Sequence, residues 1–196
     1  MSDPDLLAAL CPVLQVLSDL GVRHFVGGSI ASSAHGVARA SVDGDVVAEL
    51  GPAHVAPLVA ALRDTYYVPE ERIRDAVARR ASFNLIHLDT MLKVDVFVSQ
   101  DRPFDRRAFE RSRPTSIEGE EGATLPVSSA EDVVLAKLDW YRRGGEVSER
   151  QWTDVMGVLQ ATGSALDLPY LHRGAVELGV SDLLDRALDE ADRARR

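Results

Sequence analysis

Along residues 1–127 the hydrophobic positions follow two patterns, one with the spacing of helices and one with the short apolar runs of strands. The first helix is predicted from an N-cap at Asp3, a proline at position 4 and an apolar stripe that stops before Gly21. The proline at position 12 is expected to bend this helix. Further predicted elements are helices at 29–35, 53–65, 70–80 and 104–111, and strands at 24–26, 42–50, 83–89, 92–99 and 123–127, with a tight turn near Thr90.

From Ser128 onward the pattern is helical throughout. The first of these helices begins with a serine N-cap and acidic residues in its first turn, which suits the helix dipole. Glycines separate the predicted helices at 128–143, 148–161, 168–179 and 181–196. The sequence therefore predicts an α+β protein: a small mixed sheet flanked by helices in residues 1–127, followed by an all-helical domain in residues 128–196.

The composition is that of an ordinary globular protein and excludes few function classes. Of the 196 residues, 45% are hydrophobic and 27% are charged. The single cysteine, Cys11, cannot form an internal disulfide and favours a reducing compartment. No apolar run approaches the roughly 18 residues of a membrane span, and the acidic N-terminus is unlike a signal peptide. We therefore expect a cytoplasmic protein that does not use a membrane.

The net charge of −9 argues against a general nucleic-acid coat protein, which would be basic. Two groups of arginines still allow a local positive patch. They form either solvated helix faces or a landing surface for a polyphosphate or an RNA end. The first group is Arg72, Arg74, Arg79 and Arg80, and the second is Arg102, Arg106, Arg107, Arg111 and Arg113.

Two aspartates, Asp43 and Asp45, stand one residue apart in the strand predicted at 42–50. Because side chains alternate along a strand, both point to one face, with their backbones roughly 6.5–7 Å apart. Neighbouring carboxylates repel each other unless water or a cation separates them. Mg²⁺ prefers such oxygen ligands and completes its shell with water and substrate phosphates. The pair therefore indicates a Mg²⁺ site, with a solvated polar strand face as the alternative.

Asp95 interrupts an otherwise apolar segment, LKVDVFV, which is typical of a central strand. A carboxylate in such a strand needs a partner, because burying it alone is costly. If this strand lies beside that of Asp43 and Asp45, the three carboxylates can hold two cations about 3.5–4 Å apart, as in displacement at phosphorus. The alternative is a salt bridge from Asp95 to Lys93 or to an arginine.

The residues before the aspartate pair suit a phosphate-binding turn. Gly27, Gly28 and Ser29 join a short strand to a helix, where backbone amides and the helix N-terminus favour a phosphate. A glycine pair by itself is also consistent with a simple turn. Arg39 is placed to meet a phosphate, whereas His35 is expected to be a structural, hydrogen-bonded histidine.

In the helical half, Lys137 falls inside the apolar stripe of its helix. Its ammonium group either extends to solvent or faces an anionic ligand where the two halves meet. Asp154, at the edge of the apolar face of the next helix, pairs with Lys137, approaches the same cleft or is solvated. Trp140 and Trp152 are expected in the core or at the interface between the halves rather than stacked on a base.

The order of these motifs resembles the nucleotidyltransferase superfamily of the polymerase-β type: GGS, thirteen residues, DGD, and a later aspartate in an apolar strand. The stretch GGSIASSAHGVARASVDGD looks most like the bacterial branch of AbiEii toxins, minimal nucleotidyltransferases and aminoglycoside nucleotidyltransferases. Residues 128–145 and 149–159 are similar to the helical half of that branch. Gly44 departs from the pattern, because the family usually has an apolar residue between the carboxylates.

The resemblance implies roles for the candidate residues. In these roles a glycine turn cradles the triphosphate, two carboxylates hold Mg²⁺, a third helps to deprotonate the acceptor, and a lysine neutralises phosphate. The residues are, in that order, Gly28 and Ser29, Asp43 and Asp45, Asp95, and Lys137, with Asp154 matching the last aspartate of the family.

The implied activity is Mg²⁺-dependent transfer of a nucleoside monophosphate from a nucleoside triphosphate to a hydroxyl acceptor, with release of pyrophosphate. The acceptor is a tRNA end, a protein side chain or a small molecule such as an aminoglycoside. Because the branch includes toxins, an antitoxin is a further candidate partner. The alternative from another class is a catalytically silent domain that binds a partner protein.

Overall fold

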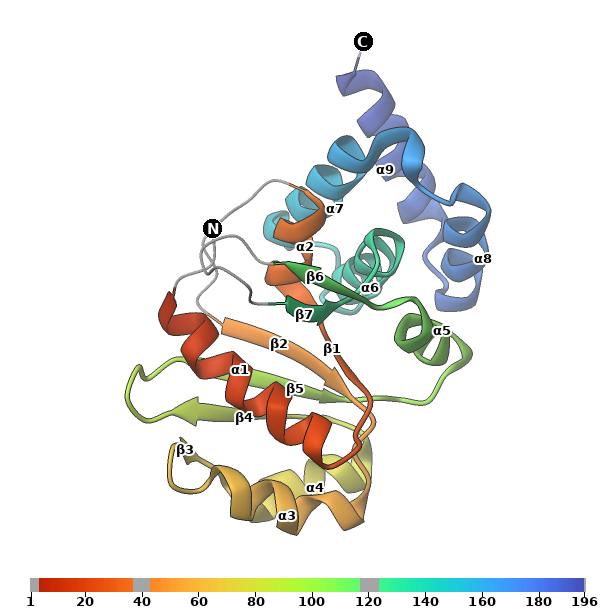
Figure 1. Ribbon diagram of the computed structural model, residues 1–196. Coiled ribbons are helices and arrows are strands. Elements are labelled where there is room, and N and C mark those ends of the chain that lie inside the picture. Colours follow the sequence, from red (N-terminus) through yellow and green to blue (C-terminus); the bar gives the residue numbers. More distant parts are fainter. Residues whose placement is uncertain (1–3, 37–42, 117–123, 196) are drawn as a thin grey trace.

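The structure is a computed structural model that describes residues 4–36, 43–116 and 124–195 (Figure 1). Within these ranges, seven strands form one mixed sheet with the order β3-β4-β5-β2-β1-β7-β6. The strands are β1 (His24–Val26), β2 (Asp43–Ala48), β3 (Tyr66–Tyr67), β4 (Ser82–His87), β5 (Lys93–Val98), β6 (Arg113–Ser116) and β7 (Thr124–Val127).

The two strands that carry the predicted aspartates are neighbours at the centre of the sheet. β2 and β5 run parallel, with Asp45 opposite Asp95 in the register. β4 and β5 form the predicted antiparallel hairpin. In its turn the Thr90 hydroxyl accepts a hydrogen bond from the Leu92 backbone amide at 3.3 Å. The expected adjacency of the two aspartate-bearing strands is therefore confirmed.

The edge strands β3 and β6 are not predicted by the hydrophobic pattern. β3 pairs with β4, and β6 pairs antiparallel with β7. The expectation that residues 101–127 contain only one helix and one final strand is therefore wrong at β6. That strand is short and contains Pro114, so pairing with its neighbour, rather than an apolar period, defines it.

The predicted helices all occur, with small shifts at their ends, in the described part of the chain. They are α1 (Pro4–Asp19), α2 (Gly28–His35), α3 (Pro52–Leu62), α4 (Glu70–Arg79), α5 (Pro103–Arg111), α6 (Ala130–Arg143), α7 (Glu149–Thr162), α8 (Leu168–Leu178) and α9 (Ser181–Ala194), with a 3₁₀ turn η1 (Gly163–Ala165) after α7. No helix in these ranges is both long and apolar enough to cross a membrane.

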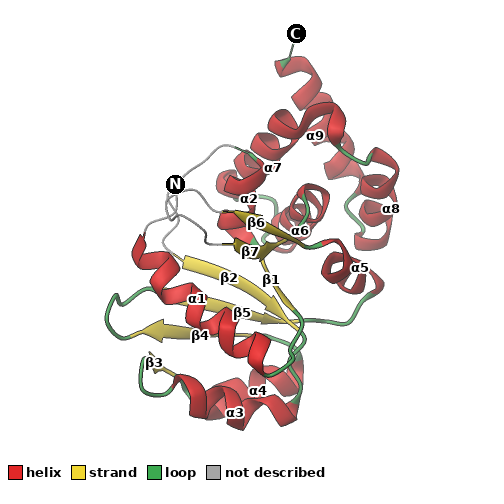
Figure 2. Ribbon diagram, viewed as in Figure 1, coloured by secondary structure: helices red, strands yellow, loops and turns green. Residues whose placement is uncertain are grey.

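The N-terminal helix α1 covers one face of the central strands (Figure 2). Along β2 every second residue is buried, which is the period of a strand with one face on the core. Gly44 belongs to that buried face, and a Cβ atom built there would lie 3.1 Å from Leu10 Cδ1 of α1. The glycine between the aspartates thus lets α1 pack close to the sheet and leaves Asp43 and Asp45 on the opposite face.

The helical half packs against the sheet half through α2, which contacts both α6 and α7. His35 at the end of α2 donates a hydrogen bond from Nε2 to the Ser128 carbonyl oxygen at 2.7 Å, so it has the structural contact expected of it. The apolar core runs without interruption from α1 to α9. Figure 1 shows α6 to α9 gathered at the end of the sheet formed by β6 and β7. A domain boundary at residue 127 stays a prediction.

Candidate active site

A cavity of about 640 Å³ lies between the sheet and helices α5, α6 and α7. The glycine turn and the aspartates of β2 line one part of it, with Phe25 and Phe97 beside them on the same sheet face. The opposite wall comes from α6 and from the first turn of α7. The cavity therefore brings together residues that the sequence places in separate halves.

The glycine turn is in direct contact with Asp45. Gly27 donates its backbone N–H to the Asp45 carbonyl oxygen at 2.9 Å, and the Ser29 backbone amide donates to the Asp45 carboxylate. Gly28 has φ +53, and a Cβ atom at this position would overlap the Asp45 carboxylate. Only glycine fits both constraints, because it accepts the left-handed backbone and leaves room for the carboxylate.

The carboxylates of β2 carry an excess of negative charge. The pKa of Asp45 is raised to about 6, first by burial and then by the neighbouring charges of Asp43 and Asp95. Lys137 and the Ser29 amide act in the opposite direction without cancelling that effect. A cation at this position would therefore stabilise the ionised form of Asp45.

Asp95 shares the sheet face of Asp45 but has a partner of its own. Its carboxylate Oδ2 lies 2.7 Å from Lys93 Nζ, and the side chains are 19% and 41% exposed, respectively. The hydrogen bond to Asp95 raises the pKa of Lys93. Asp43 and Asp45 line the cavity, whereas Asp95 does not. The alternative weighed for Asp95, an ion pair with Lys93, is thus present together with its adjacency to Asp45.

Asp43 and Asp45 fit a Mg²⁺ ion by their chemistry, since they offer two carboxylates on one face of a strand at the wall of a cavity. Across the described residues, no three histidine, cysteine or acidic side chains converge closely enough to hold an ion. Two protein carboxylates are a usual number for Mg²⁺, whose remaining ligands are water and phosphate oxygens. The two-cation site formed by Asp43, Asp45 and Asp95 stays a prediction.

Lys137 forms a buried ion pair at the helical wall. Its Nζ lies 2.7 Å from Asp154 Oδ2, with side chains 8% and 6% exposed, and it also donates to Gln151 Oε1 at 3.2 Å. Lys137 lines the cavity and does not extend to bulk solvent, and Asp154 stands behind it. Of the arrangements that the sequence allows for these two residues, the structure shows the ion pair between them.

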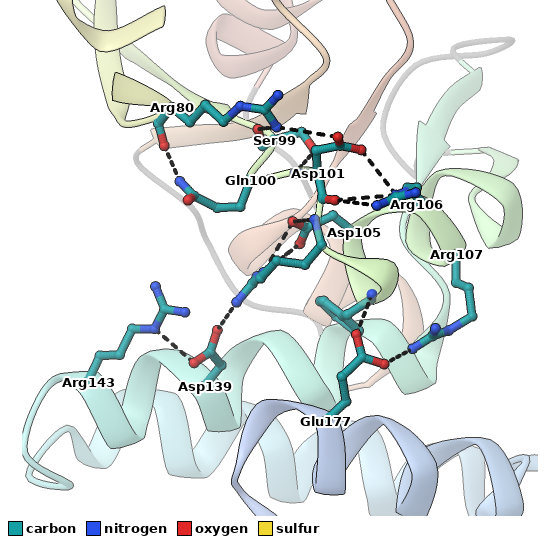
Figure 3. A network of polar contacts seen from close by, with 12 residues as sticks. Arg80, Ser99, Gln100, Asp101, Asp105, Arg106, Arg107, Asp139, Arg143 and Glu177 are labelled. Atoms are coloured by element: carbon teal, nitrogen blue, oxygen red, sulfur yellow. Dashed lines mark hydrogen bonds and ion pairs between the residues drawn. The ribbon is translucent and has the colours of Figure 1, made fainter. Parts of the chain in front are cut away.

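Most of the arginines in the two sequence clusters are paired with acidic side chains. In the second cluster, Arg106 bonds to Asp101 and Arg107 to Glu177 (Figure 3). In both clusters together, only Arg80 and Arg102 line the cavity. Arg39 lies outside the described residues. For the most part the two clusters are therefore ion-paired surfaces rather than a binding surface for a polyphosphate or an RNA end.

The helical wall of the cavity contains polar residues that the sequence reading missed. The signal was a polar stripe on α6 at helical spacing, formed by Asp132, Asp139 and Arg143. The ion pairs that fix this stripe come from distant segments, as in the contact of Arg102 with Asp139, so spacing alone could not find them. Arg150 of α7 completes the set.

A second cavity of about 550 Å³ lies beside α1 and α5 and is lined by residues such as Cys11, Arg23 and Phe109. Among the described residues that line it, none is acidic and none is a predicted site residue. The chemistry predicted from the sequence therefore belongs to the cavity at the glycine turn.

No protein-family model matches the sequence, and no curated protein matches it. Among solved structures, the chain is similar to the antibiotic-resistance factor ANT(2″)-Ia, with 15% identity and a TM-score of 0.56, over 99% of this chain and 100% of that one. It is also similar to an antigenic nucleotidyltransferase-like protein from Paracoccidioides brasiliensis, with 17% identity and a TM-score of 0.52, over 95% and 93% of the two chains.

A third structure, a protein from Thermotoga maritima assigned as a nucleotidyltransferase, has 17% identity and a TM-score of 0.50, over 79% of this chain and 96% of that one. The chain thus has the fold of these nucleotidyltransferase structures, which confirms the predicted fold class. Identities this low concern the fold, and the AbiEii-like branch stays a prediction.

Proposed function

We propose that this chain is a Mg²⁺-dependent nucleotidyltransferase, which moves a nucleoside monophosphate from a nucleoside triphosphate to a hydroxyl acceptor and releases pyrophosphate. The placement of Asp45 carries the proposal. Its carboxylate lies at the cavity beside Asp43, is contacted by the glycine turn, and has a pKa raised to about 6. Such a perturbed carboxylate in a cleft is typical of a functional site.

Asp43 and Asp45 are the residues that would hold Mg²⁺. When bound, the ion would polarise the phosphate and neutralise charge on its oxygens. Asp95 is the proposed acceptor of the proton from the attacking hydroxyl. Because Asp95 is bonded to Lys93, that ion pair has to open or shift before the carboxylate can take the proton.

The other residues of the proposal supply position and positive charge. The turn at Gly27, Gly28 and Ser29 would bind phosphate oxygens through the Gly28 backbone amide and the Ser29 hydroxyl, because the backbone amides of Gly27 and Ser29 already donate to Asp45. The ammonium of Lys137 faces the cavity with Asp154 behind it and would stabilise the departing pyrophosphate. In this proposal the acceleration comes mainly from holding the hydroxyl and the phosphorus in line. Arg39 is included only because of its place in the sequence, between the glycine turn and the aspartate pair.

Calorimetry with each nucleoside triphosphate, with and without Mg²⁺, tests the proposal. The expected result is binding that requires Mg²⁺ and weakens at least about tenfold in Asp45→Asn. Losing a residue that binds the metal should weaken binding at least as much as losing a residue that only orients such a ligand. Asp75→Asn is the matched control, because Asp75 is a half-exposed carboxylate paired with Arg79 on the surface of α4.

Binding that ignores Mg²⁺, or no binding by the wild-type chain, would instead support the catalytically silent, protein-binding domain. Incubation with labelled triphosphates and total cell extract then identifies the acceptor, by whether the label enters RNA, protein or small metabolites. A toxin role of the AbiEii type, with an antitoxin as partner, is the narrower form of the proposal and rests on the resemblance.

A further inference from the structure

The wall of the cavity that α6 and α7 form has its own chemical character. Three of its residues, Trp140 and Arg143 of α6 and Arg150 of α7, are called the tryptophan–arginine wall below. Trp140 is 51% exposed, and its ring packs edge to face on that of Phe97, with the ring centres 5.7 Å apart. A large aromatic surface that borders a cavity and remains half exposed is suited to stacking on a flat ligand.

The acidic side chains near this wall are already neutralised by the protein. Asp105 accepts hydrogen bonds from Arg102 at 2.9 and 3.1 Å, and Asp139 accepts from Arg102 at 3.2 Å and Arg143 at 2.8 Å (Figure 3). Asp132 accepts from the Tyr170 hydroxyl at 2.5 Å. A polycationic acceptor such as an aminoglycoside would have to break these bonds to find a carboxylate, so the wall disfavours it.

The positive groups of the wall, in contrast, keep donors available. The Arg143 side chain is 51% exposed, its Nε binds Asp139, and its guanidinium carbon lies 5.9 Å from the Trp140 ring centre. The Arg150 side chain is exposed and has no ion pair or hydrogen bond to any residue that the structure describes. Arginine binds phosphate through several donors at once, and aromatic rings stack on bases.

We propose that the tryptophan–arginine wall binds the acceptor, and that this acceptor is nucleotide-like, with a base stacked on Trp140 and phosphate held by Arg143 and Arg150. This inference rests on the proposed function, because it names the molecule whose hydroxyl receives the nucleoside monophosphate. An RNA end and a free nucleotide share this chemistry. The hydroxyl of such an acceptor would replace pyrophosphate on the transferred phosphorus and lose its proton to Asp95.

Fluorescence anisotropy with a labelled hexaribonucleotide of mixed sequence, in the presence of a non-hydrolysable triphosphate and Mg²⁺, tests the proposal. Trp140→Ala is expected to weaken binding of the hexaribonucleotide about tenfold. Arg143→Gln combined with Arg150→Gln should weaken it and reduce the slope of log affinity against log salt by about 1.4, the value for two lost phosphate contacts on a single strand. Trp140→Phe keeps an aromatic face and should restore most of the binding.

The control variants lie on other surfaces. Tyr67→Ala removes an aromatic side chain that is 53% exposed, and Arg79→Gln removes an exposed arginine of α4. Both should leave binding of the hexaribonucleotide unchanged. Unlabelled AMP as competitor separates the two sources: competition at similar concentrations indicates a free nucleotide, and much weaker competition indicates an RNA end.

Failure of this inference is distinguishable from failure of the proposed function. If the wall variants bind the hexaribonucleotide as the wild type does, or if tobramycin binds more tightly than either nucleotide probe, the acceptor proposal is overturned. It is also overturned if Trp140→Ala weakens triphosphate binding instead, since the wall then belongs to the donor. In each of these cases Mg²⁺-dependent triphosphate binding that is lost in Asp45→Asn would leave the transferase proposal standing.

Discussion

Two lysine–aspartate pairs flank the candidate active site, one in the sheet and one in the helical half, and their Nζ–Oδ2 distances are both 2.7 Å. The pair of Lys93 and Asp95 lies on β5 with side chains 41% and 19% exposed. The pair of Lys137 and Asp154 joins α6 to α7 with side chains 8% and 6% exposed. The two ion pairs therefore have the same Nζ–Oδ2 distance but differ greatly in their exposure to solvent.

The difference matters because water sets the energy of an ion pair. A solvated pair gains little and can open at small cost, whereas breaking a buried pair leaves a charge without water or partner. On this basis, the pair on β5 can release its carboxylate during a reaction, and the pair between the helices holds its ammonium at a fixed place.

Replacing Lys137 by Met should cost about 3–5 kcal/mol of unfolding free energy, because Asp154 is left as an uncompensated buried charge. Urea unfolding followed by circular dichroism measures the loss. The double variant Lys137→Met with Asp154→Leu should recover most of it, since two apolar side chains then replace the pair. A single variant as stable as the wild type would show that water reaches the pair and would remove the contrast.

Replacing Asp45 by Asn should stabilise the chain by about 3 kcal/mol above pH 6 when no divalent ion is present, since each pKa unit corresponds to about 1.4 kcal/mol. The raised pKa means that the folded state binds this proton more tightly than the unfolded state, so the contribution of Asp45 to stability is lost as pH rises from 3.8 to about 6. Unfolding of both proteins with EDTA present, at intervals between these pH values and pH 7.5, gives the difference. A difference in unfolding free energy between the two proteins that grows toward acid pH would contradict this prediction.

Replacing Lys93 by Met should change the unfolding free energy by less than about 1 kcal/mol, because the pair with Asp95 is partly solvated. The same urea experiment applies, repeated at high salt, where the difference from the wild type should shrink further. Asp75 and Arg79 form a more exposed pair on α4, with side chains 57% and 74% exposed, so Arg79→Gln is the reference for an ordinary surface pair. A loss of unfolding free energy as large as that of the Lys137 variant would mean that the pair of Lys93 and Asp95 behaves energetically like a buried pair.

The central strands could be predicted because their residues carry a local signal. The apolar run around Asp95 indicates a central strand, and the one-residue spacing of Asp43 and Asp45 fixes their common face. The structure places these strands side by side in register. The glycine turn also has a local cause, since Gly28 needs both its positive φ and its missing side chain.

The helical wall and the edge strands could not be predicted, because their causes are not local. Asp139 reads as part of a solvated helix face, yet it is held by Arg102 from the segment before α5. Strand β3 has only two residues, too few for any period to appear. Which arginines pair and which border the cavity depends on the packing of α5 and α6, and no spacing in the sequence contains that information.

The tight contact between Leu10 and Gly44 has a consequence for evolution and engineering of this chain. The back of the acidic strand rests on α1, so a larger residue at position 44 would tilt the strand unless position 10 shrinks at the same time. Substitutions at these two positions should therefore be tolerated in compensating combinations rather than singly. A core contact between the first helix and the second strand thus constrains the spacing of two carboxylates that lie on the other side of the sheet.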